Sequence, residues 1–134
     1  MSRAKVLKIL TVDDNHSQRK MMSTLLLRVG FEVTTAATGA EAISRSITDA
    51  PDAILLDINL PDSSGYEVCK RIKADVRTDS IPIIFYTGEM DGAAKNHAEM
   101  VGAAAFLTSP VELNHLGTVI ESVVEKAKVL RAQR

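Results

Sequence analysis

Three aspartates stand at the ends of two apolar runs and could together hold a metal ion. Asp13 and Asp14 follow the run of residues 6–12, and Asp57 ends the run of residues 53–57. Carboxylates brought close together repel one another, and at least one pKa rises unless a cation lies between them. Mg²⁺ takes such hard oxygen ligands, usually together with waters and phosphate oxygens. The three residues therefore indicate magnesium-assisted phosphoryl transfer.

Other metal-binding patterns do not fit the chain. An EF-hand loop beginning at Asp57 fails, because Pro61 and Asp62 occupy places where a ligand and a turn glycine are needed. The histidines are scattered, which argues against a zinc site, and each is expected at the surface. They are His16, His97 and His115.

Two candidate residues keep plain structural interpretations. Asp14 could be a helix cap or a solvated charge instead of a metal ligand, since acids and residues such as Asn15 are common N-caps. Cys69 is the single cysteine, so it cannot form an internal disulfide, and its apolar neighbours at helical spacing predict a small core side chain.

Strand and helix patterns alternate along the chain, and these elements must position the aspartates. Strands are predicted at residues 6–12, 31–36, 53–57, 82–86 and 104–107. Helices are predicted at residues 17–29, from a Thr38/Glu41 capping box to Pro51, from Gly65 to beyond Val76, and at 90–101 and 112–132. The third helix is expected to bury Tyr66, Cys69, Ile72 and Val76.

This alternation predicts an α/β fold, a doubly wound five-stranded parallel sheet, in one domain spanning residues 1–134. Parallel strands bring their carboxyl ends to one edge, where open α/β sheets bind ligands. That edge gathers the residues that follow the strands: Asp13, Asp14, Asp57, Thr87 and Ser109.

Composition narrows the class of protein. The formal charge of −1 lacks the basic footprint of a nucleic-acid binder, and 46% apolar with 25% charged residues is typical of a soluble globular protein. No apolar run approaches the roughly 20 residues needed to span a bilayer. The first residues carry no signal-peptide pattern, so a cytoplasmic protein is expected, with neither membrane nor direct nucleic-acid binding.

In the order of its motifs, the chain resembles the receiver domain of the two-component response-regulator family. The motifs are Val12-Asp13-Asp14, Asp57 followed by Leu60-Pro61 and Gly65, Thr87-Gly88, and Gly102-Ala103 leading to Phe106-Leu107 and Pro110. A lone Asp-Asp pair is weak evidence, but this series covers nearly the whole chain. The resemblance implies the flavodoxin-like (βα)5 fold.

The resemblance also implies roles for individual residues. Asp57 would accept a phosphoryl group from a histidine kinase or a phosphotransfer protein. Mg²⁺ would be held by Asp13, Asp14, Asp57 and the backbone carbonyl of Asn59. Thr87 would be the switch hydroxyl and Phe106 the switch aromatic, although Phe106 could also be a plain core residue. The chain would not be an enzyme beyond catalysing its own phosphorylation and dephosphorylation.

One position departs from the family. Ser109 stands before Pro110 where the family normally has a lysine whose ammonium pairs with the phosphoryl group. Without that charge, Mg²⁺ should carry more of the neutralisation, and the switch should be weaker. By resemblance, the Ser109–Pro110 peptide is expected to be cis.

Three other functions compete with the phosphoacceptor. A degenerate receiver would bind a partner without being phosphorylated. An aspartyl-phosphate phosphatase carries a second aspartate two residues after its nucleophile, where this chain has Asn59. A flavodoxin-like flavin carrier needs a phosphate-binding loop after the first strand, where Asp13 and Asp14 would repel phosphate.

The last predicted helix carries an apolar seam at heptad spacing. The seam comprises Leu113, Leu116, Ile120, Val123, Ala127 and Leu130. A helix of about 20 residues is about 30 Å long, so its end should extend past strands of about five residues. We expect the face built from the fourth helix, the fifth strand and the last helix to mediate a homodimer or partner docking. Alternatively, the end is exposed and its apolar residues are scattered.

Overall fold

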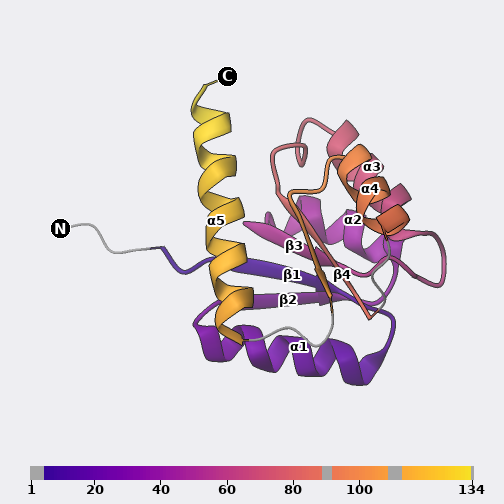
Figure 1. The fold of residues 1–134 in the computed structure, drawn as a ribbon. Coiled ribbons are helices and arrows are strands. Elements are labelled where there is room, and N and C mark those ends of the chain that lie inside the picture. The colour runs from indigo at the N-terminus through magenta and orange to yellow at the C-terminus, as the bar shows by residue number, and fades with distance from the viewer. Residues whose placement is uncertain (1–4, 89–91, 109–112, 134) are drawn as a thin grey trace.

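The computed structural model describes residues 5–88, 92–108 and 113–133, along which five strands alternate with five helices (Figure 1). The strands are β1 (Lys8–Val12), β2 (Glu32–Ala36), β3 (Ala53–Leu56), β4 (Ile83–Thr87) and β5 (Ala105–Thr108). The helices are α1 (His16–Val29), α2 (Gly39–Thr48), α3 (Gly65–Ala74), α4 (Gly92–Met100) and α5 (Leu113–Ala132). The predicted order of elements is confirmed.

All strand pairs are parallel, and the order across the sheet is β2-β1-β3-β4-β5. This is the flavodoxin-like doubly wound order, whose topological switch point lies between β1 and β3. β1 begins at Lys8 rather than at residue 6, because Lys8 is the first residue with a partner in β2, Glu32. Val6 lies outside the sheet and is half exposed.

Helices cover both faces of the sheet, α1 and α5 on one face and α2, α3 and α4 on the other (Figure 1). Successive strand residues point to opposite faces, so each central strand feeds two cores. In β3, Ile54 and Leu56 belong to the core under α2, α3 and α4, while Ala53 and Leu55 belong to the core under α1 and α5. Burial on both faces explains why β3 is apolar without alternation.

Side-chain caps fix where the helices begin. Asn15 accepts a hydrogen bond from the backbone N–H of Gln18 (3.0 Å) at the start of α1. Thr38 accepts from the N–H of Glu41 (3.1 Å), and the Glu41 carboxylate accepts from the N–H of Ala37 (3.2 Å). The Thr38/Glu41 cap is therefore confirmed, with the carboxylate bound one residue earlier than in the usual capping box.

The end of α3 corrects the prediction that Val76 is buried. The helix ends at Ala74, and Asp75 has extended backbone angles (φ −103°, ψ 123°). Val76 therefore leaves the helix face and is 85% exposed. Cys69 and Ile72 are buried as predicted, and Tyr66 is half buried against the same core.

The apolar seam of α5 serves two purposes. Leu116, Ile120, Val123 and Ala127 are buried, and the first three belong to the core under α1 and α5. Leu130 is 65% exposed, and the last turns of the helix extend beyond the sheet (Figure 1). The predicted extension of the helix end is confirmed. None of the helices in the described part of the chain is long and apolar enough to cross a membrane.

Candidate functional site

The register of β1 and β3 brings the three aspartates together. Val12 and Leu56 are paired residues at the ends of these neighbouring strands, so Asp13 and Asp57 are the next residues along each strand. The backbone N–H of Asp57 donates to the carbonyl of Val12 (3.0 Å), which extends the pairing. One carboxylate oxygen from each of Asp13, Asp14 and Asp57 lies within 4.8 Å of the others.

The two aspartates after β1 have different surroundings. Asp13 is buried, and its Oδ1 accepts a hydrogen bond from the backbone N–H of Asn15 (2.9 Å). Asp14 is exposed, and Asn15 rather than Asp14 caps α1. The capping interpretation of Asp14 is therefore wrong, because Asn15 already fills that place. The Asp14 carboxylate lies with the acidic cluster.

Burial and mutual repulsion raise the pKa of two of these acids. The pKa of Asp57 is raised to about 6, first by burial and then by the charge of Asp13, although backbone N–H groups of Ile58 and Asn59 oppose the shift. The pKa of Asp13 is also raised, again chiefly by burial. A divalent cation bound here would relieve both the burial penalty and the repulsion.

The loop after β3 is folded back on itself. Asn59 and Ser64 form an isolated antiparallel bridge, and the N–H of Gly65 donates to the carbonyl of Ile58. Ser64 also caps α3 by accepting from the N–H of Glu67 (3.2 Å). The loop therefore holds Asn59, whose carbonyl is the predicted fourth ligand, close to Asp57.

Asp62 anchors this loop to the neighbouring helix, a role that the sequence did not reveal. Its carboxylate accepts hydrogen bonds from the backbone N–H groups of Gly39 (2.8 Å) and Ala40 (3.0 Å) at the start of α2. These bonds hold the pKa of Asp62 below its usual range. The interaction joins residues far apart in the chain, so the only available signal was an unexplained acid after Leu60-Pro61.

Arg19 is a second residue near the site that the sequence analysis missed. Its Nη1 donates to the backbone carbonyl of Asp13 (2.7 Å), and its charge offsets a small part of the burial that raises the pKa of that residue. The available signal was a basic residue in the first turns of the helix that follows the two acids. Arg19 ties α1 to the end of β1 and places a positive charge beside the acidic cluster.

A comparison with protein families decides the identity of this arrangement. The family model described as the response regulator receiver domain matches residues 9–121. The chain belongs to this family. The sheet order, the strand-end aspartates and the predicted fold class agree with it.

Known proteins are similar to this chain along most of its length. The alkaline phosphatase synthesis transcriptional regulatory protein PhoP of Bacillus subtilis is 30% identical over 122 residues, 91% of this chain and 50% of that protein. The solved chemotaxis protein CheY4 of Vibrio cholerae is 33% identical, with a TM-score of 0.83 over 89% of this chain and 99% of that one.

A third relative carries a metal ion. The receiver domain of the sensor histidine kinase PA1611 of Pseudomonas aeruginosa is 26% identical, with a TM-score of 0.83 over 90% of this chain and 99% of that one. Its structure has a magnesium ion coordinated in the active site cleft. The present chain spans half or less of the length of these curated relatives, for example 23% of the length of the response regulator PleD of Caulobacter vibrioides.

The predicted switch residues of the receiver lie on β4 and β5. Thr87 ends β4 and is buried, near the carboxyl edge that bears the aspartates. Phe106 pairs in register with Phe85 and is half buried against the core. A small hollow of about 140 Å³ adjoins Phe106 between α4 and β5. Ser109 and its bond to Pro110 lie outside the described residues, so the cis peptide stays a prediction.

The remaining sequence predictions around the site can also be placed. His16, His97 and His115 are exposed, as expected. Cys69 is buried, its thiol donates to the carbonyl of Val101 (3.4 Å), and burial raises its pKa to about 11. The plain structural interpretation of Cys69 is therefore confirmed.

Proposed function

We propose that this chain is a phosphoacceptor switch in which Asp57 takes a phosphoryl group from a histidine kinase or phosphotransfer protein. The observation that carries the proposal is the cluster of three carboxylates at the switch point of a receiver fold. Residues 1–134 would form one receiver domain, located in the cytoplasm. Its enzymatic activity would extend only to its own phosphorylation and dephosphorylation.

The residues of the cluster divide the chemistry between them. Asp57, with a pKa of about 6, is mostly ionised at neutral pH and can act as the nucleophile. The N–H groups of Ile58 and Asn59 orient its carboxylate. Mg²⁺ held by Asp13, Asp14, Asp57 and the Asn59 carbonyl would supply charge neutralisation at the phosphoryl oxygens. The donor set fits this ion, since all four groups offer hard oxygen atoms.

The proposed output begins at Thr87. Its hydroxyl can donate a hydrogen bond to a phosphoryl group on Asp57, which would draw the end of β4 toward the site. Phe106 would then change position on the face formed by α4, β5 and α5. The hollow beside Phe106 supports this step, because it offers space next to the half-buried ring.

Acetyl phosphate tests the proposal directly. Incubation with acetyl phosphate and Mg²⁺ is expected to add the mass of one phosphoryl group to the intact protein, and EDTA is expected to prevent this. A receiver that works without phosphorylation would stay unmodified under both conditions. That result would favour the degenerate receiver over the phosphoacceptor.

Mg²⁺ binding is expected to weaken in acid. The cation must displace the proton from Asp57, whose pKa is about 6, so the affinity should be nearly constant above pH 7 and fall below pH 6. One displaced proton corresponds to a loss of about tenfold between pH 7 and pH 5. Isothermal titration calorimetry of Asp57→Asn is the control, since its affinity should vary less over this range. An equal pH dependence in both proteins would contradict the assignment.

Ser109→Lys is expected to restore a more typical switch. A lysine ammonium paired with the phosphoryl group should lengthen the lifetime of the phosphorylated form or increase the response of a partner, by roughly threefold to tenfold. Ser109→Met adds similar length without charge and serves as the control. If the lysine variant changes neither property, another group already compensates for the missing charge.

The partners of the whole protein are part of the proposal. Some relatives are transcriptional regulators, such as PhoP of Bacillus subtilis, so a longer protein could act on DNA through a segment outside this domain. The domain itself, with a net charge of −1, is proposed to bind a kinase or phosphotransfer protein rather than nucleic acid.

Self-association through the face of α4, β5 and α5 is proposed as a second mode of interaction. Leu130 is 65% exposed at the end of α5, whereas Val123 is part of the core. Leu130→Glu should therefore lower the molar mass measured by light scattering after phosphorylation, without unfolding the domain. Lys128→Glu, a charge change at an exposed residue of the same helix, is the control. A parent protein that is monomeric in both states would exclude the homodimer.

A further inference from the structure

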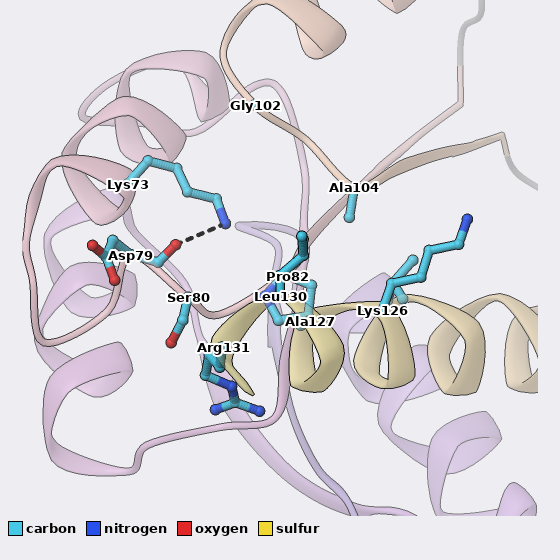
Figure 2. Close-up of a pocket in the computed structure, with 11 residues that line it drawn as sticks. Lys73, Asp79, Ser80, Pro82, Gly102, Ala104, Lys126, Ala127, Leu130 and Arg131 are labelled. Atoms are coloured by element: carbon cyan, nitrogen blue, oxygen red, sulfur yellow. Dashed lines mark hydrogen bonds between the residues drawn. The ribbon is translucent and has the colours of Figure 1, made fainter. Parts of the chain in front are cut away.

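Figure 2 shows a second hollow, of about 310 Å³. It lies at the opposite edge of the sheet from the aspartates. Pro82 and Ala104 line it directly before β4 and β5, so it opens at the amino ends of these strands. Its other walls are Lys73 near the end of α3, residues 79–80 of the loop that follows, and the C-terminal half of α5. Its volume is at the lower end of the range for small-molecule sites, about 300 Å³.

The floor of this hollow is apolar. Val123, Ala127 and Leu130 line it at spacings of four and three residues, which places them on one face of α5. Pro82 and Ala104 face them from the strand side (Figure 2). Leu130 is 65% exposed, so the hollow offers an apolar surface that the domain leaves open to solvent.

The rim of the hollow is positively charged. Lys73, Lys126 and Arg131 line it together with one acid, Asp79, although the chain as a whole has a net charge of −1. The Asp79 carboxylate is directed away from Pro82 and Leu130 (Figure 2). Within the described ranges, Lys126 and Arg131 form no ion pair. Their charges are therefore available to a ligand.

Lys73 fixes the backbone of the wall that residues 79–81 form. Its Nζ donates to the backbone carbonyls of Ile81 (2.7 Å) and Asp79 (3.3 Å), which holds residues 79–81 against α3. Gly102, in a left-handed conformation (φ 90°), turns the chain from α4 toward β5 on the opposite side. The hollow is thus built by fixed backbone on two sides and by α5 on the third.

We propose that this hollow binds a small organic anion with an apolar body of about two fused rings. The apolar floor would take the body, and the anionic group would pair with Lys126 on one side of the floor or with Arg131 on the other (Figure 2). The site lies at the far edge of the sheet from Asp57, so its occupancy does not depend on the proposed phosphorylation.

Two dyes that differ only in charge can test the site. The anionic probe is 8-anilinonaphthalene-1-sulfonate, and the neutral probe is N-phenyl-1-naphthylamine, which lacks the sulfonate. Fluorescence titration is expected to show one saturable site for the anion. Amide chemical shifts should change at Gly102, at Ala104 and along residues 123–131, but not around Asp57. Asp57→Asn should bind both probes as the parent does.

Charge-matched variants separate the proposed site from general dye binding. Lys126→Gln/Arg131→Gln should weaken binding of the anion by about tenfold or more and leave the neutral probe nearly unchanged. Lys70→Gln/Lys128→Gln makes the same change in net charge at exposed residues outside the lining and should have no effect. Ala104→Trp, at an exposed position, should block both probes by filling the hollow.

The proposal is overturned by any of three results. These results are the absence of saturable binding of the anion, an equal affinity of the anion for Lys126→Gln/Arg131→Gln and the parent, and chemical-shift changes that map to another surface. Near-ultraviolet circular dichroism of each variant checks that dye binding does not come from a loosened core.

Discussion

Asp57→Asn is expected to lose all labelling by acetyl phosphate and, without metal, to be more stable than the parent at pH 7. Labelling is lost because an amide is not a nucleophile toward phosphorus, while the other acids of the cluster stay in place. Stability rises because the fold holds the Asp57 carboxylate in a half-buried position beside Asp13, at a cost that an amide does not have.

The sign of the stability change follows from the direction of the pKa shift. The folded pKa of Asp57, about 6, lies above the ordinary value of 3.8, so the folded protein binds its proton more tightly than the unfolded chain. The destabilisation is absent below pH 3.8, grows between pH 3.8 and 6, and is complete above pH 6. For this half-exposed group the screened effect is about 1 to 2 kcal/mol.

Asp75→Asn is the matched control with the opposite sign. Asp75 pairs with Arg77 (Nη2 to Oδ2, 2.7 Å), which lowers its pKa to about 2, so its ionised form stabilises the fold. This contribution is present above the ordinary pKa and is lost as the pH falls through about 2. At pH 7 Asp75→Asn should be slightly less stable than the parent, yet accept the phosphoryl group normally.

Urea unfolding in EDTA at pH 5 and pH 7, together with intact mass after acetyl phosphate treatment, measures both effects. The gain of Asp57→Asn over the parent should be larger at pH 7 than at pH 5. Persistent labelling of Asp57→Asn would show that another residue is the phosphoacceptor. If Asp57→Asn is less stable than the parent at pH 7, the ionised Asp57 carboxylate does not destabilise the folded protein.

The acidic cluster could be predicted from sequence because a parallel sheet imposes it. Residues 6–12 and 53–57 are recognisable as buried strands, and carboxyl ends of parallel strands share an edge, so Asp13 and Asp57 had to approach one another once the strands were neighbours. The pairing of Val12 with Leu56 supplies that adjacency. Helix periodicity predicts the ends of helices less well than their middles. Val76 continues the apolar spacing of α3, but the extended backbone of Asp75 ends the helix and takes Val76 off its apolar face.

Contacts that depend on tertiary packing could not be predicted in the same way. Asp62 reaches Gly39 across 23 positions in the chain, and no local pattern ties an acid in one loop to the start of another helix. The same limit applies to Arg19. Its hydrogen bond to the carbonyl of Asp13 depends on the orientation of α1 relative to the end of β1. Such contacts appear only when separate elements are packed together.

Gly65→Ala is expected to damage the site through the backbone alone. A Cβ at Gly65 would lie 2.9 Å from the Cα of Ile58 and would also overlap the carbonyl oxygen of Asp57. Both neighbours are backbone atoms of the folded loop, so neither can swing aside as a side chain would. We expect the free energy of unfolding to fall by about 1 to 3 kcal/mol, as in other overpacked sites.

The same displacement should affect function more than stability. Moving the backbone at Asp57 and Ile58 shifts the nucleophile and the Asn59 carbonyl together, and a misplacement of about 1 Å can lower a reaction rate by about 100-fold. Gly88→Ala is the control, because a Cβ at Gly88 meets no atom within 4 Å. The rate of acetyl phosphate labelling and urea unfolding measure the two effects. If Gly65→Ala labels as fast as Gly88→Ala, the close packing of Gly65 against Asp57 and Ile58 does not position the phosphoacceptor.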